Sequence, residues 1–216
     1  MPAAFLTGVV DALIERCASD TDAMAVARTE FDERRGRVFE DEEGWETRTA
    51  IFLEYYATER QDPELGESPA LTAARSEEYE GREREALGAW SRSYRCLAEV
   101  LSLADGVVVI ADAIGGAHIE VAERRGLPGV STGDIAELRI VAFEDAIHFG
   151  SGILWHPAGT RDPLLGHVAT MREAGVAREV ICDFAASLKT RSLRYAHLEP
   201  SAVYEKAEPY SSSASR

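Results

Sequence analysis

Residues 94–111 read YRCLAEVLSLADGVVVIA, and this stretch decides the fold of the chain. Upstream of it, apolar residues recur with the period of a helix. From Tyr94 onward the side chains fall into two alternating sets, which is typical of a β-strand. The tripeptide Ala104-Asp105-Gly106 supplies a turn, and an apolar run resumes at Val107. The stretch therefore predicts a β-hairpin whose second strand covers 107–111.

Further strands are predicted on the C-terminal side of this hairpin. They cover residues 118–122, 135–143 and 146–154, with Gly115-Gly116 and Glu144-Asp145 as turns. Five short strands joined by tight turns are typical of a small barrel. The sequence predicts a five-stranded antiparallel barrel of the SH3 or OB type.

Helical periodicity dominates both ends of the chain. Apolar residues recur at helical spacing over four segments before the barrel and two after it: 4–17, about 20–35, 43–60, 82–94, 162–175 and 177–194. Residues 61–70, QDPELGESPA, are predicted to form a connection because they are rich in proline, glycine and acid.

The predicted fold class is α+β, with a helical N-terminal half, a small barrel and C-terminal helices. We divide the chain into a helical domain (1–93), the barrel (94–156), C-terminal helices that pack on the rest (157–198) and a disordered tail (199–216). The serine run at 211–213 is the reason for the last assignment.

Composition limits the range of partners. The chain has 216 residues, 45% of them hydrophobic and 28% charged, and its formal net charge is -15. Nucleic acids bind proteins mainly through cationic side chains, so we predict no nucleic-acid partner. Anionic membrane surfaces are disfavoured for the same reason, and the excess of carboxylates is expected to promote solubility.

The N-terminus and the cysteines bear on localisation. The N-terminal segment lacks a basic start, and Asp11 and Glu15 interrupt its apolar residues, so neither a signal peptide nor a membrane span is predicted. Cys17, Cys96 and Cys182 lie far apart in apolar surroundings. Buried, reduced thiols are expected of them, which predicts a cytoplasmic protein.

The block from Trp45 to about Trp155 resembles a group of uncharacterised bacterial proteins. The motifs that carry the resemblance are Phe52-Leu53-Glu54-Tyr55-Tyr56, Arg82-Glu83-Arg84-Glu85-Ala86-Leu87, Glu99-Val100-Leu101, Asp112, Gly116, Glu120-Val121, Glu123-Arg124, Gly133-Asp134 and Arg139. The resemblance covers about half of the chain, and it implies a fold but no activity. Some members end in a cysteine-rich zinc motif of the SecA type, which this chain lacks, so no zinc role is carried over.

Polar residues around the predicted barrel are the candidate binding residues. Trp155-His156-Pro157 with Arg161 and Asp162 forms one polar cluster, whose structural explanation is a junction between barrel and capped helix. The candidate binding residues are Asp112, Arg139, His148, His156 and Arg161. We predict no catalytic residue, no metal site and no cofactor, because the five histidines form neither an HxH nor an HExxH pair.

Three other motifs are better explained by structure than by chemistry. The loop 127–134, LPGVSTGD, could hold an anion through its backbone, but it has no Walker lysine. Ser151 lies between glycines without forming GxSxG, and the acidic run 40–46 lacks EF-hand spacing. Turn geometry, a curved strand and a solvated helix start account for them.

Two functional hypotheses follow. The first is a non-enzymatic interaction or regulatory protein that binds a protein partner through the edge or groove of the barrel. The alternative is an enzyme whose polar site is assembled from distant residues: Glu99, Asp112, Arg139, His148 and His156. These residues should line one deep pocket if the alternative holds.

Overall fold

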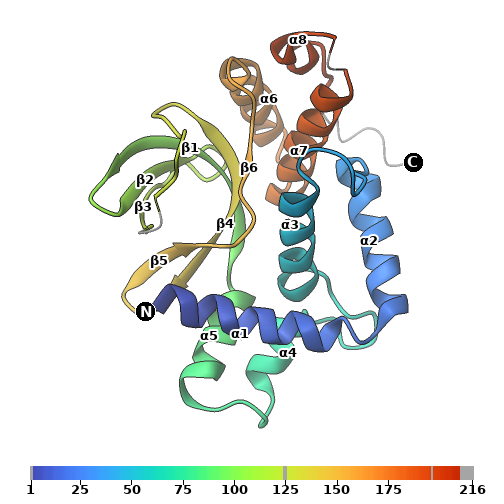
Figure 1. The fold of residues 1–216 in the computed structure, drawn as a ribbon, viewed down its shortest axis with the longest axis vertical. Helices are drawn as coiled ribbons and strands as arrows, with labels where there is room; N and C mark the ends of the chain where they lie inside the picture. Colours follow the sequence, from blue (N-terminus) through green and yellow to red (C-terminus); the bar gives the residue numbers. More distant parts are fainter. Residues whose placement is uncertain (1, 124–125, 196, 210–216) are drawn as a thin grey trace.

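The computed structural model describes residues 2–123, 126–195 and 197–209, and Figure 1 shows the path of the chain. Five helices precede the sheet in these described residues: α1 (Pro2–Cys17), α2 (Thr21–Arg35), α3 (Trp45–Thr58), α4 (Pro69–Arg75) and α5 (Gly81–Ser91). Three follow it: α6 (Arg161–Glu173), α7 (Arg178–Arg194) and α8 (Pro200–Glu205). The predicted α+β class, with helices on both sides of a small β unit, is confirmed.

The boundaries of the N-terminal helices follow from local capping. The Asp20 side chain accepts the backbone N–H of Ala23 at 3.0 Å, which satisfies one of the free donors at the start of α2. Gly36 ends α2 with a φ of +79°, a conformation that glycine adopts at little cost. Ser68 caps α4 in the same way through Leu71 N, at 3.4 Å. The sequence analysis had assigned the start of α4 to a connection, so this short helix was missed.

The strands form one curled antiparallel sheet. They are β1 (Tyr94–Ala104), β2 (Val107–Asp112), β3 (His118–Ala122), β4 (Ile135–Phe143), β5 (Ala146–Phe149) and β6 (Leu154–Trp155). The order is β3-β2-β1-β4-β5, and β6 pairs with the start of β4. The register of β1 on β2 shifts between Val100 and Ser102, and such a bulge increases the local twist. The sheet curls into a half-barrel in which β3 and β5 approach one another without pairing.

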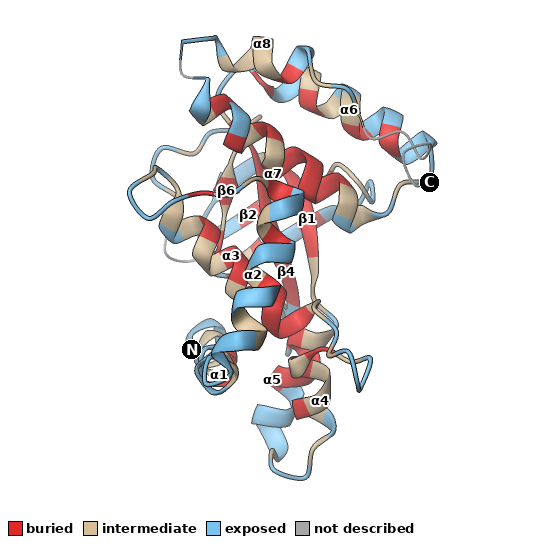
Figure 2. Ribbon diagram, turned by 90° about the vertical axis from the view of Figure 1, so that its right-hand side faces the viewer, coloured by how far each residue is buried: buried red, intermediate tan, exposed pale blue. Residues whose placement is uncertain are grey.

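The two faces of the sheet bury two different sets of apolar side chains. One face lines the half-barrel with apolar side chains such as Ile110, Val121 and Leu138. The other face carries Leu97 and Ile135, which pack with α6, α7 and α8. Figure 2 shows that buried residues concentrate where α7 crosses β1 and β4. A large part of the buried core therefore lies between the sheet and the C-terminal helices.

The predicted fifth strand over 146–154 is wrong in its second half. Strand β5 ends at Phe149, and β6 is a separate two-residue strand. The intervening chain runs against α3: a Cβ on Gly152 would lie 2.4 Å from Ile51 Cγ1 and 2.9 Å from Ile51 N. The glycines permit this close approach, and the chain leaves the strand there.

The predicted disordered tail is wrong for residues 200–205, which form α8. Tyr204 on α8 is fully buried and packs with the C-terminal helices. The physical reason that this short segment docks is its apolar area, since Val203 and Ala207 pack on the same cluster as Tyr204. The part of the predicted tail over 210–216 lies outside the described residues.

None of the described helices has both the length and the apolar character that a membrane crossing requires.

Candidate functional site

The structure places the five predicted binding residues on different elements, where most of them have different partners. Asp112 ends β2, Arg139 lies on β4 and His148 on β5. His156 follows β6, and Arg161 begins α6. Of the five, His156 and Arg161 line a common depression, of about 370 Å³, at the start of α6. The polar residues of the enzyme hypothesis therefore have separate partners instead of facing one another.

Asp112 forms an ion pair with Arg178 at the start of α7. The distance from Asp112 Oδ2 to Arg178 Nη2 is 2.9 Å. Burial raises the pKa of Asp112, but the hydrogen bond from Arg178 and backbone N–H donors outweigh it, so the pKa is lowered overall. Arg178 also lies over the Tyr94 ring and donates to Arg95 O at 3.2 Å. Arg178 thus joins the start of α7 to the end of β2 and to the start of β1.

His156 is buried beside Tyr204. Its Nδ1 lies 2.8 Å from the Tyr204 hydroxyl, and Nε2 has no hydrogen-bond partner in the described part of the chain. Burial lowers the pKa of His156 to about 4, so the ring is neutral at pH 7. The contact fastens α8 to the segment after β6.

His148 and Arg161 differ in exposure. His148 is buried, burial lowers its pKa, and neither ring nitrogen has a hydrogen-bond partner among the described residues. Arg161 is exposed and pairs with Glu99 at 2.8 Å and with Asp162 at 2.6 Å.

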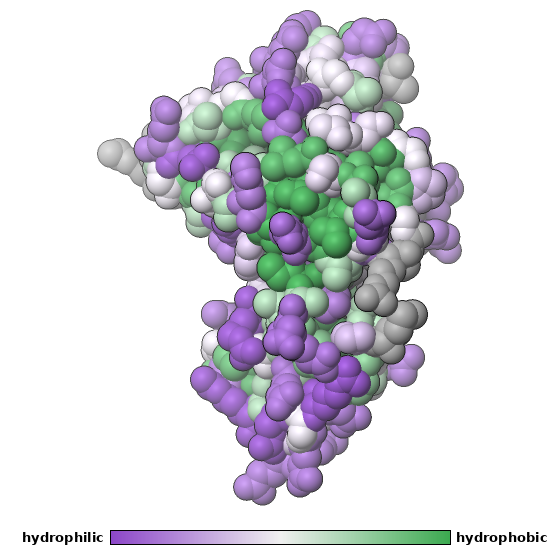
Figure 3. Space-filling model, turned by 90° about the vertical axis from the view of Figure 1, so that its left-hand side faces the viewer, coloured by the Kyte–Doolittle hydropathy of each residue, from purple (hydrophilic) through white to green (hydrophobic). Residues whose placement is uncertain are grey.

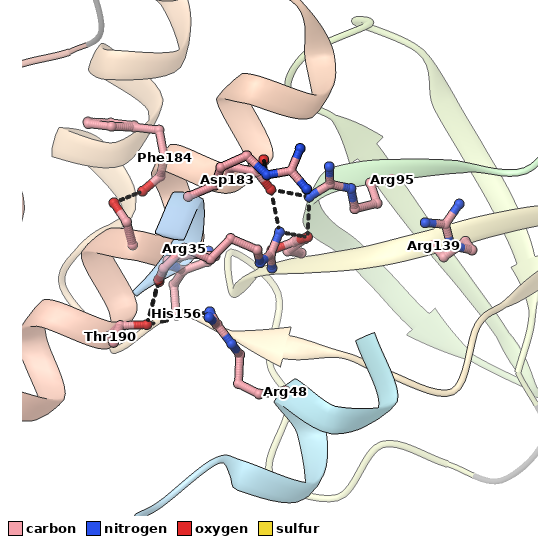
Figure 4. Close-up of polar contacts among 12 residues, drawn as sticks. Arg35, Arg48, Arg95, Arg139, His156, Asp183, Phe184 and Thr190 are labelled. Carbon is pink, nitrogen blue, oxygen red and sulfur yellow. Dashed lines mark hydrogen bonds and ion pairs between the residues drawn. The ribbon is translucent and has the colours of Figure 1, made fainter. Parts of the chain in front are cut away.

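A buried ion network occupies the centre of the molecule. Arg35 from the end of α2 lies 2.5 Å from Glu137 on β4 and 2.9 Å from Asp183 on α7. Arg95 on β1 contacts Asp183 Oδ1 at 2.5 Å and Glu137 Oε1 at 3.5 Å. Figure 4 shows these side chains meeting between the helices and the sheet. Two guanidiniums and two carboxylates from four elements thus neutralise one another.

The network continues along α3. Glu59 accepts from Arg95 Nε at 3.0 Å and also bonds Arg139. Burial raises the pKa of Glu59, but Arg95 and Arg139 outweigh it and lower the pKa overall. Glu54 accepts the backbone N–H of Ser151 and lies 3.6 Å from Arg139, while burial raises its pKa. The ion pairs therefore link α3 to β1 and β4, and the hydrogen bond from Ser151 links it to the chain after β5.

Arg48 forms the edge of this network. Its Nη2 donates to Gly36 O at 2.6 Å, and its Nη1 lies 3.4 Å from Thr190 Oγ1. Burial, and then repulsion from Arg35, lower the pKa of Arg48 to about 9. Because Arg48 bonds a carbonyl and a hydroxyl in place of a carboxylate, its charge is the least compensated of the four arginines.

Sequence reasoning named Arg139 but missed the rest of the network. Arg95, Glu137 and Arg139 alternate with apolar residues along their strands, a pattern that normally indicates a solvent-exposed face. Here α2, α3 and α7 cover that face. Charged residues between apolar neighbours on β1 and β4 were the available signal, but their partners come from elements far apart in sequence.

A cleft opens above this network between α2 and α7. Its volume is about 760 Å³. Asp183 and Phe184 line it, together with arginines from both helices: Arg34, Arg191 and Arg194. Arg34 Nε lies 3.6 Å from Asp183 Oδ2, and its guanidinium lies over the Tyr55 ring. The cleft therefore combines cationic, apolar and buried acidic groups.

A second hollow lies between the β2–β3 and β4–β5 hairpins, and we call it the inter-hairpin depression. Its volume is about 410 Å³, and it is lined by Val107, Glu120, Val121, Ala122, Ala142, Glu144, Asp145, Ala146 and Ile147. Val107 is 39% exposed, and Ile147 is half-buried. Figure 3 shows a broad apolar area at the height of the half-barrel, bordered by hydrophilic residues.

The described residues contain no group of three or more His, Cys, Asp and Glu side chains placed to hold a metal ion. Comparison with protein-family models, curated proteins and solved structures found no match to this chain. The resemblance to uncharacterised bacterial proteins stays a prediction. Function is therefore inferred from the geometry of this chain.

Proposed function

We propose that the protein is a non-enzymatic interaction protein that binds a segment of a partner protein in the inter-hairpin depression. The observation that carries the proposal is an accessible apolar hollow between β3 and β5, the two ends of the strand order. Within the described residues neither strand has a second neighbour in the sheet. Apolar surface next to open strand edges is typical of sites that receive extended peptide segments.

Charge at the depression indicates the chemistry of the partner segment. Glu144 is paired with Arg82 at 2.7 Å. Glu120 and Asp145 are exposed and have no ion-pair partner in the described part of the chain. Among residues 2–123, 126–195 and 197–209, no basic side chain lines the depression. We therefore propose a partner segment in which apolar side chains alternate with lysine or arginine.

Selection from a library of displayed random peptides tests the proposal. Enriched peptides should combine apolar and basic residues and should bind more weakly as salt concentration rises. Val107→Asp and Glu120→Lys should each weaken binding about tenfold, the loss expected of a central contact. Val26→Asp is the matched control, because Val26 is 53% exposed on α2.

Enriched peptides without a preference for lysine or arginine would overturn the proposal that the partner segment is basic. Binding that Val107→Asp leaves unchanged would overturn the site. The polar residues of the enzyme hypothesis lie in separate contacts, so no observation within residues 2–123, 126–195 and 197–209 favours that alternative.

We further propose that the protein works in the bacterial cytoplasm. All three cysteines are free, and Cys96 and Cys182 are buried, which supports a reducing compartment. Fractionation of the source cells checks this, with recovery in a membrane or secreted fraction as the opposing result.

A further inference from the structure

We propose that the cleft between α2 and α7 binds a small molecule that carries a carboxylate or phosphate group next to an apolar ring. This site is separate from the inter-hairpin depression and does not depend on it. At about 760 Å³ the cleft has the size typical of small-molecule sites. The proposal depends on the order of side chains along α7.

One stripe of α7 lines the cleft. Val180, Phe184, Ser187, Arg191 and Arg194 are spaced by three or four residues, so they lie along one face of the helix. The stripe is apolar at its start and cationic at its end. A ligand with an apolar end and an anionic end matches this order in one orientation.

Free guanidinium donors make the cationic end suitable for an anion. Arg191 is exposed and has no hydrogen-bond or ion-pair partner among the described residues. Arg34 uses its Nε for its polar contacts, a hydrogen bond to Glu30 O at 3.2 Å and an ion pair with Asp183 at 3.6 Å, and its guanidinium lies over the Tyr55 ring. The terminal guanidinium nitrogens of Arg191 and Arg34 are therefore available to donate hydrogen bonds to a carboxylate or phosphate. Arg194 contacts Arg37 O and Glu42, so it contributes charge more than new bonds.

The acidic residues of the cleft do not cancel this charge. Asp183 forms part of the lining, but Arg35 and Arg95 already neutralise it at 2.9 and 2.5 Å. Glu33 and Glu208 are the two other carboxylates in the lining. The lining thus holds three guanidiniums, of which Arg194 is paired with Glu42 at 3.8 Å. Arg191 keeps a free guanidinium within the described residues, and it is the group that we expect to bind the anion.

Titration with simple probes tests the site. Phenyl phosphate and benzoate carry the ring and the anion, inorganic phosphate lacks the ring, and benzyl alcohol lacks the charge. Amide chemical shifts in two-dimensional NMR spectra should move in α2 and α7 with phenyl phosphate or benzoate. Inorganic phosphate and benzyl alcohol should bind at least about tenfold more weakly, because each lacks one of the two contacts. The two aromatic anions distinguish a phosphate ligand from a carboxylate ligand.

Variants distinguish the site from general attraction of anions. Arg191→Gln should weaken binding of the aromatic anions about tenfold, and Arg191→Lys should restore only part of it, because lysine lacks the planar fork. Arg16→Gln is the matched control, since Arg16 is an exposed helical arginine on α1. Unchanged affinity in Arg191→Gln, equal losses in both variants, or shifts confined to other elements would each overturn the proposal.

Discussion

At the scale of single residues, the buried charges are the most consequential feature. Arg35 and Glu137 are 0% and 1% exposed, and they lie 2.5 Å apart. Removing one partner of a buried pair leaves the other charge in a medium of low dielectric constant, which costs far more than breaking a solvated pair. The exposed pair Arg16–Glu78 has the same chemistry at 2.7 Å and provides a comparison within one chain.

Arg35→Met should therefore lower the free energy of unfolding by about 3–5 kcal/mol. Arg16→Met should lower it far less, because exposed ion pairs are screened by solvent and contribute little. Urea unfolding followed by circular dichroism measures both. An equal decrease in the free energy of unfolding in the two variants would show that burial does not make the Arg35 ion pairs more important for stability.

His156 predicts a pH dependence. Its folded pKa is about 4 and its unfolded value is near 6.5, so between these values the unfolded chain binds more protons. The contribution of His156 to stability is present above pH 6.5 and is lost as the pH falls toward 4. The shift corresponds to about 3 kcal/mol.

His156→Asn isolates this effect, because asparagine does not titrate and its side chain can bond Tyr204. Between pH 6.5 and 4.5 the free energy of unfolding should fall more steeply in the wild type than in His156→Asn. Parallel curves from urea unfolding at each pH would refute the assignment.

At the scale of elements, the chain after β5 depends on a close approach to α3. A Cβ on Gly152 would meet the Ile51 backbone as well as its side chain, and backbone cannot move aside as a long side chain can. Gly166 on α6 differs, because a Cβ there has no neighbour within 4 Å. Two glycines thus have opposite expected responses to the same substitution.

Gly152→Ala should lower the free energy of unfolding by about 2–3 kcal/mol through overpacking. Gly166→Ala should raise it by about 0.5–1 kcal/mol, since alanine favours an exposed helix interior. Urea unfolding of both variants decides this, and stabilisation by Gly152→Ala would contradict the described path after β5.

At the scale of the whole molecule, the ion network joins elements that are distant in sequence. It connects α2 and α3 from the N-terminal half, β1 and β4 from the sheet, and α7 from the C-terminal part. Contacts of this kind make stability cooperative, because each side chain depends on partners from several elements.

Hydrogen exchange should show this cooperativity. In the wild type the slowest amides should lie in the buried parts of β1, β4 and α7, which the ion network joins. Arg35→Met should accelerate exchange in these elements as well as in α2, whereas Arg16→Met should not. Acceleration limited to α2 would show that the network does not couple the halves of the molecule.

The sequence by itself determined the elements of this protein. Periodicity located six of the eight described helices, and turn residues located the hairpins at Asp105-Gly106 and Glu144-Asp145. These signals are local, because periodicity and turn chemistry depend on residues close in the chain. The α4 and α8 helices were missed because each is short and begins with a proline, a residue that is also typical of a connection.

Only the tertiary structure decided which charges are buried and which hollows stay open. The alternation of Arg95, Glu137 and Arg139 with apolar residues fits a solvated strand face equally well until α2, α3 and α7 cover it. The α2–α7 cleft likewise combines side chains that lie far apart in sequence. Periodicity carries no information on contacts between distant segments, so the network and the cleft follow from packing alone.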